Sequence, residues 1–174
     1  MLSNVQLIAR VLILLSLVLS NSACGFRLRG SVEVPDVLQQ THISGLAEFS
    51  DLNQALKRVL QRSGSEVLRG PENAKSIITI SGENFHRRVL SVDAVGQASE
   101  YELHYKYNFS IKSADGEVIV PNQPISVTRD YQFDPNNILA KDAEEAQIRA
   151  DMVKFSVRQM MRRVNSQLKS KQTK

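Results

Sequence analysis

The alternation of apolar and polar residues is clearest between positions 100 and 112. Every second residue there is aromatic or aliphatic, and charged or polar residues fill the positions between them. The apolar row consists of Tyr101, Leu103, Tyr105, Tyr107, Phe109 and Ile111. A period of two is typical of a strand that buries one face. The pattern therefore predicts a strand with one polar face and one aromatic face that packs in the core.

Three further segments are typical of strands because they are rich in β-branched and aromatic residues and are bounded by turn residues. They are residues 37–44, 76–90 and 125–133. Gly82 can bend or bulge the second segment, and Asp115–Gly116 makes the turn before the last. Arg129 stands in the apolar row of the last strand. We expect it to pair with an acid or with backbone carbonyl groups, because a buried guanidinium without a partner is costly.

Two segments have the period of an amphipathic helix. Residues 51–63 follow Ser50, a favourable N-cap, and end near Gly64. Residues 140–168 contain neither glycine nor proline and carry an apolar stripe. The order strand, helix, three strands, helix predicts an α+β fold. We expect two helices packed on one face of a four-stranded, mostly antiparallel sheet, whose other face stays polar.

The N-terminal segment carries a targeting signal. An apolar run at residues 11–19 follows Arg10 and precedes Ser22-Ala23-Cys24, which holds the only cysteine of the chain. The run is too short for a membrane span, which takes roughly 20 apolar residues. Small residues followed by cysteine indicate a bacterial lipoprotein signal. We expect residues 1–23 to be removed and Cys24 to be acylated.

The remaining chain divides in a simple way under this hypothesis. Residues 24–36 form a lipidated tether and residues 37–174 a single α+β domain, in which the basic tail 169–174 is disordered. Several acyl chains on one cysteine give stable membrane anchoring. In enterobacterial lipoproteins an Asp after the cysteine favours the inner membrane, and here Gly25 stands in its place. We therefore expect the protein on the outer membrane, lipid-anchored at its periplasmic face.

Composition and motifs argue against several other functions. The formal net charge of +4 is modest for a nucleic-acid binder, and export makes nucleic acid an unsuitable partner. The histidines, His42, His86 and His104, do not have the spacing of a metal site and do not adjoin a nucleophile motif. We expect no cofactor and no enzymatic activity. The residues alone indicate a lipid-anchored binding or scaffolding module.

Three stretches resemble the signature segments of the LptE family of lipopolysaccharide-assembly lipoproteins. They are Cys-Gly-Phe-Arg-Leu-Arg-Gly at 24–30, Gly-Gln-Ala-Ser-Glu-Tyr-Glu-Leu at 96–103 and Leu-Ala-Lys-Asp-Ala-Glu-Glu at 139–145. The resemblance implies a non-enzymatic outer-membrane lipoprotein. Such a protein plugs the lumen of the β-barrel LptD in a one-to-one complex, helps that barrel assemble, and binds lipopolysaccharide on its way to the outer leaflet.

The resemblance also implies candidate site residues. Lys141 matches a family position proposed to contact the phosphates of lipopolysaccharide; the alternative is that it only solvates the start of a helix. Before Gly96, where related sequences can carry a basic residue, this chain has Val95. Arg87 or Arg88 would have to supply the charge instead. The apolar loop at 91–95, which includes Val92, suits insertion among acyl chains or into a barrel wall.

Two other function classes stay open at this level. A pilotin-like or barrel-assembly accessory lipoprotein would share the anchor and the small domain, but would bind a protein partner without lipopolysaccharide. Salt-sensitive binding to lipopolysaccharide micelles distinguishes the two. An envelope hydrolase is disfavoured by the lack of a catalytic constellation.

Overall fold

The computed structural model describes residues 36–172, with side chains to residue 170. The expected signal peptide, the acylated Cys24 and residues 24–35 of the expected tether lie outside the described residues. Within this range, five strands and two α-helices follow a short 3-10 helix. In chain order they are η2 (Asp36–Leu38), β1 (Gln40–Ser44), α2 (Asp51–Arg62), β2 (Glu66–Leu68), β3 (Ser76–Val92), β4 (Ala98–Ser113), β5 (Val118–Gln132) and α3 (Ile138–Gln172).

The strands form one mixed sheet in the order β2-β1-β3-β4-β5. β1 is parallel to both of its neighbours, whereas β3, β4 and β5 form an antiparallel meander. The α+β class is confirmed. The expectation of four strands in a mostly antiparallel sheet is wrong, because β2 adds a fifth strand and two of the four pairings are parallel.

The parallel pairing follows from the position of α2 in the chain. Parallel neighbours need a crossover of a dozen or more residues, and α2 provides it between β1 and β2. β2 has only three residues, too few for an alternating pattern to reveal it. The helix itself has the expected local signals, since the Ser50 side chain accepts a hydrogen bond from the Asn53 backbone N–H.

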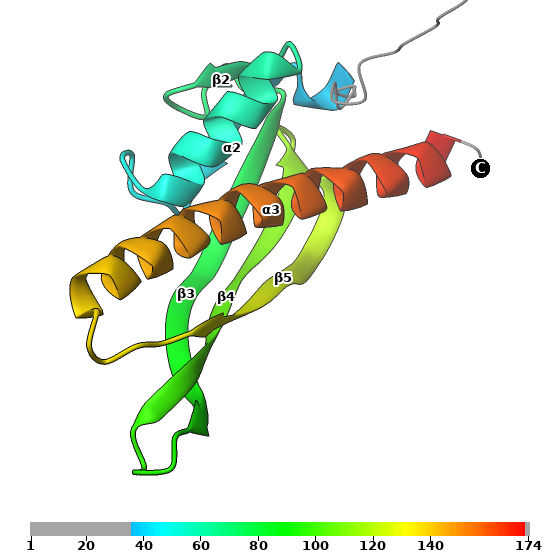
Figure 1. The fold of residues 1–174 in the computed structure, drawn as a ribbon. Coiled ribbons are helices and arrows are strands. Elements are labelled where there is room, and N and C mark those ends of the chain that lie inside the picture. The colour runs from blue at the N-terminus through cyan, green and yellow to red at the C-terminus, as the bar shows by residue number, and fades with distance from the viewer. Residues whose placement is uncertain (1–35, 173–174) are drawn as a thin grey trace, which may run out of the picture. The chain divides into compact units, whose positions relative to one another are not determined.

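Both helices lie on the same face of the sheet, and the β3–β4 hairpin extends beyond them (Figure 1). The core between the two layers combines the apolar row of β4 with the stripes of both helices. Its buried members include Leu103, Tyr105, Tyr107, Phe109 and Ile111 of β4, Leu52, Leu56 and Leu60 of α2, and Met152, Val157, Met160 and Val164 of α3. The aromatic face predicted for residues 100–112 therefore lies in the core.

Two irregular positions singled out in the sequence are Gly82 and Arg129. The pairing of β3 with β4 shifts register between Ser81 and Asn84, so Gly82 lies in a bulge. Arg129 keeps the apolar register opposite Leu103 and donates a hydrogen bond to the Thr128 carbonyl at 2.9 Å. The expected hydrogen bond to a carbonyl group is present, but its acceptor is the preceding residue of the same strand and not an adjacent strand, and Arg129 is exposed rather than buried.

The end of the sheet and the last helix differ in extent from the prediction. β5 begins at Val118, contains Pro121 and Pro124, and is one of the two edge strands, the other being β2. α3 continues to Gln172, so residues 169–172 of the expected disordered tail are helical. Among the described helices, none is both long enough and apolar enough to cross a membrane.

Candidate functional site

The start of α3 is tied to β3 by an ion pair. The Arg87 guanidinium donates to the Glu145 carboxylate at 2.7 Å, and the Tyr131 hydroxyl of β5 donates to the same carboxylate oxygen at 2.5 Å. The hydrogen bond to Glu145 raises the pKa of Arg87, so this guanidinium stays charged. Burial, and then the hydrogen bond to Glu145, raise the pKa of Tyr131, which keeps its donor proton. Strand and helix thus hold one cation at a fixed place.

An aromatic cluster supports the same cation from the sheet. The Arg87 guanidinium carbon lies 4.6 Å from the centroid of the Tyr101 ring, a cation–π geometry. Tyr101 in turn contacts Tyr131 and Phe133, with ring centroids 5.9 Å and 5.1 Å away. Arg87 occupies the apolar register of β3, between Phe85 and Val89. Glu145 and Tyr131, its partners, carry no distinguishing signal in the sequence and were not among the predicted site residues.

Lys141 lies one turn before Glu145 on α3. Its ammonium group pairs with Glu144 at 2.8 Å, and its side chain is 21% exposed. Two apolar residues precede it, Ile138 and Leu139, both exposed, Leu139 to 86%. The first two turns of α3 therefore bring Lys141 and Arg87 to one end of the helix, beside exposed apolar side chains.

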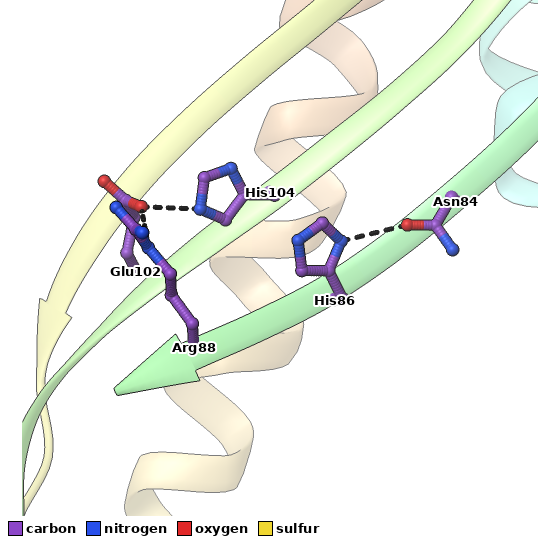
Figure 2. Close-up of polar contacts among 5 residues, drawn as sticks. All are labelled: Asn84, His86, Arg88, Glu102 and His104. Atoms are coloured by element: carbon purple, nitrogen blue, oxygen red, sulfur yellow. Dashed lines mark hydrogen bonds and ion pairs between the residues drawn. The ribbon is translucent and has the colours of Figure 1, made fainter. Parts of the chain in front are cut away.

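Arg88 points to the opposite face of the sheet. Figure 2 shows it on the face away from α3, where its Nε donates to Glu102 at 2.6 Å. His104 contacts the same carboxylate, and its ring stacks on that of His86 with centroids 4.8 Å apart. The hydrogen bond from Arg88, followed by that from His104, lowers the pKa of Glu102. The three predicted basic residues therefore do not form one site. Lys141 lies one turn of α3 away from the partner of Arg87, Glu145, whereas Arg88 belongs to a polar group on the other face of the sheet.

The hairpin tip, residues 89–96, consists of the end of β3 and an ordered turn, and it carries apolar side chains. The Asp93 carboxylate accepts hydrogen bonds from the backbone N–H groups of Val95 and Gln97, each at 2.9 Å, and the Gly96 N–H bonds to the Asp93 carbonyl. The exposed apolar side chains of the tip are Val89, Leu90, Val92 and Val95, the last exposed to 77%. The turn thus presents Val92 and Val95 to the surroundings.

The site combines fixed cations with nearby apolar surface. Lys141 and Arg87 can pair with phosphate oxygens through charge-assisted hydrogen bonds, and the hairpin tip can contact hydrocarbon. Within residues 36–172, no group of three or more histidine, cysteine or acidic side chains is placed to hold a metal ion. This arrangement suits a surface that binds an amphipathic anion.

Solved structures of bacterial lipoproteins share the fold. The solution structure of an uncharacterized lipoprotein B from Nitrosomonas europaea is 31% identical, with a TM-score of 0.65, and the match covers 80% of this chain and 90% of that chain. The rare lipoprotein B from Shewanella oneidensis matches with a TM-score of 0.61 at 22% identity, over 77% of this chain and 96% of that one. The architecture described above is thus that of a class of small bacterial lipoproteins.

A family model assigns the chain more narrowly than the class of small bacterial lipoproteins does. The model of the LptE family, described as lipopolysaccharide-assembly, matches residues 38–164, and the chain belongs to this family. The LPS-assembly lipoprotein LptE of Photorhabdus laumondii is 27% identical over 147 residues, which cover 84% of this chain and 80% of that protein. LptE of Pectobacterium atrosepticum is 27% identical over 154 residues, 84% of this chain and 79% of that protein.

Proposed function

We propose that the protein is an outer-membrane lipoprotein that binds lipopolysaccharide and assembles one-to-one with the β-barrel LptD. The observation that carries the proposal is the placement of Lys141 and Arg87 at the start of α3, next to exposed apolar residues. Membership of the LptE family supports it. Lipopolysaccharide has clustered phosphates joined to acyl chains, which is the chemistry that this surface complements.

Lys141 is the residue best suited to meet a phosphate. Its present partner, Glu144, is 46% exposed and only one turn away, and such surface ion pairs contribute little to stability. A phosphate can therefore replace Glu144 at small cost. Arg87 is held more firmly by Glu145 and Tyr131, so it provides a fixed positive charge beside the incoming ligand.

The barrel is the proposed partner for the hairpin tip and for the uncovered face of the sheet. The tip projects beyond both helices (Figure 1) and is apolar, as expected for a segment that contacts a protein wall. The uncovered face carries Arg88, Glu102 and His104, charges of both signs that can pair with polar side chains of a partner. Acylated Cys24 would hold the complex at the membrane.

The test separates lipid binding from barrel binding in one variant. Lys141→Glu replaces attraction for phosphate by repulsion, and we expect a loss of about 1–3 kcal/mol in lipopolysaccharide binding, the scale of a charged hydrogen bond. Folding should be retained, because an acid near a helix N-terminus is favoured. Affinity is measured by titration, and the barrel complex by its yield in co-purification.

A matched control lies on the same helix. Lys154 pairs with Asp151 three residues away at 3.0 Å, as Lys141 pairs with Glu144, so Lys154→Glu makes the same charge change at a different place. Its effect on lipopolysaccharide affinity should be small. Unaltered affinity of Lys141→Glu at low salt would remove Lys141 as a contact. Loss of the barrel complex would instead assign the helix start to the protein interface.

A further inference from the structure

A cavity of about 410 Å³ lies where two parallel strands of the sheet end. It is lined by Ser44 and Leu68, the last residues of β1 and β2, and by side chains of α2 and of the adjoining loops. Ligands of α/β sheets commonly bind in the crevice outside the carboxyl ends of parallel strands. Small-molecule sites have volumes of roughly 300–1,000 Å³. Neither Lys141 nor Arg87 lines this cavity, so it is separate from the site described above.

A buried amide oxygen at this cavity has no hydrogen-bond donor. Asn53 of α2 lines the cavity and is only 4% exposed. Its Nδ2 group donates to the Ala47 carbonyl at 3.0 Å, which fixes the orientation of the amide. Its Oδ1 atom receives no hydrogen bond from any residue that the structure describes. Buried polar atoms are normally paired, so this oxygen indicates that a ligand or a water molecule completes the cavity.

Two cations from different elements line the same cavity. Lys57 comes from α2, and Arg69 directly follows β2. Neither forms a salt bridge with another described residue. Glu48 is the only acid among the described residues that line the cavity, so positive charge is in excess there. A water molecule could satisfy Asn53, but it would leave this excess charge without a counterpart.

The cavity also offers hydrogen-bond acceptors. The His42 Nδ1 atom lies 3.2 Å from the Leu68 carbonyl oxygen. A carbonyl oxygen only accepts, so in the neutral ring Nδ1 carries the proton and Nε2 is an acceptor. The Asn53 oxygen and the Glu48 carboxylate are further acceptors. Hydroxyl groups both donate and accept, so this mixed set matches a ligand that has several hydroxyl groups and one anionic group.

We propose that this cavity binds an anionic sugar, that is, a sugar that carries a carboxylate or phosphate group. Lys57 and Arg69 pair with the anion through charge-assisted hydrogen bonds. Asn53 and His42 accept hydrogen bonds from the sugar hydroxyls. The ligand is a free sugar or the saccharide part of a larger molecule such as lipopolysaccharide. The site does not depend on the proposed function.

The test uses the full acylated chain in micelles of a neutral detergent, with glucuronate as the probe. Binding is followed by the NMR signal of the Asn53 side-chain amide, which should shift in a saturable way in the wild type. The variant Lys57→Gln/Arg69→Gln should lower the affinity roughly ten-fold or more, because it removes both partners of the anion. The lack of a saturable shift in the wild type would overturn the site.

A control variant removes two charges from the same region without touching the cavity. Arg58 and Arg62 of α2 are exposed and do not line it. Arg58→Gln/Arg62→Gln should change the affinity for glucuronate less than about two-fold, because salt screens charges at a distance. Equal weakening by the two double variants would show that glucuronate responds only to net charge, and would overturn the site.

Two further probes test the two parts of the ligand. Glucose has the hydroxyl groups without the carboxylate, and acetate has the carboxylate without the sugar ring. Each should bind about ten-fold more weakly than glucuronate or worse, because each leaves part of the polar lining without a partner. Equal binding of glucose would overturn the requirement for an anion. Equal binding of acetate would overturn the requirement for a sugar.

A competition experiment identifies the source of the sugar. Core oligosaccharide released from lipopolysaccharide is added to the chain that has bound glucuronate. Displacement of glucuronate assigns the site to the saccharide of lipopolysaccharide, and retention of glucuronate assigns it to a free sugar. The glucuronate titration itself contains neither lipopolysaccharide nor a barrel, so its failure leaves the proposed function untouched.

Discussion

Neighbouring residues on β3 have different partners because a strand alternates its side chains between two faces. Arg87 faces α3 and pairs with Glu145, whereas Arg88 faces the other side and pairs with Glu102. The period of two predicts that the two arginines separate. Which of them faces the helix depends on the bulge at Gly82, which shifts the register by an amount that the sequence alone does not specify.

Glu102 leads to a prediction about acid stability. Its pKa is lowered below the ordinary 4.5, mainly by the hydrogen bond from Arg88. A carboxylate whose pKa is lower in the folded state stabilises the protein above its unfolded pKa, and this contribution is lost as the pH falls through the folded value. We expect the free energy of unfolding of the wild type to decline below pH 4.5 more steeply than that of Glu102→Gln.

The measurement is denaturant unfolding at a series of pH values. Glu117→Gln serves as the control, since Glu117 is exposed and has no ion pair among the described residues. The free energy of unfolding of Glu117→Gln should decline with falling pH in parallel with that of the wild type. Identical acid profiles for Glu102→Gln and the wild type would contradict a stabilising role for the Arg88–Glu102–His104 group.

Helices and strands differed in how well they could be predicted. α2 carries its own start and stop signals in Ser50 and Gly64, so its bounds were close to those predicted. β2 pairs only because α2 returns the chain beside β1, and this long-range cause leaves no local pattern. The long β4 was evident because its apolar row is uninterrupted from Tyr101 to Ile111.

The loop between β1 and α2 depends on Gly45. Its φ is +87°, and a Cβ atom there would lie 2.0 Å from the Ile80 carbonyl oxygen of β3. Gly116 has nearly the same φ, +88°, but nothing within 4 Å of a Cβ. Gly116→Ala should cost about 1–2 kcal/mol of unfolding free energy from backbone strain alone. Gly45→Ala should cost about 1–3 kcal/mol more, because the loop must also move away from β3.

Chemical denaturation of both glycine variants measures the difference. The comparison removes the shared strain and leaves the contact with Ile80. Equal destabilisation of the two variants would indicate that the loop moves freely and that its packing on β3 contributes nothing.

At the scale of the whole molecule, the fold class followed from the order of elements, but the sheet order did not. The composition of the chain and the periodicity of its apolar residues predicted two helices packed on one sheet. The central position of β3, between a parallel and an antiparallel neighbour, depends on contacts between β1 and β3 that lie more than thirty residues apart, such as Thr41 with Ser76. Likewise, Lys141 was identified from the resemblance, whereas the ion pair of Arg87 with Glu145, one turn further along the same helix, required the packing of α3 on the sheet.

The anchor gives a prediction about the whole protein. Cys24→Ala should abolish acylation and leave an unprocessed or mislocalised chain, because the lipid attachment needs the thiol. The domain should keep its stability, since no core residue is changed. Metabolic labelling with palmitate tests the first part, and thermal unfolding the second. Label retained in the alanine variant would exclude Cys24 as the acylated residue.

The edge strand β5 has a consequence for how the protein behaves in a crowded compartment. A free edge can serve as a template for a strand of another molecule and so begin aggregation. β5 lacks two backbone donors, at Pro121 and Pro124, and its pairing with β4 shifts register between Phe109 and Ile111. Arg129 and Asp130 add charge farther along the same strand. A second copy of the chain would therefore have difficulty adding a strand to the sheet at β5.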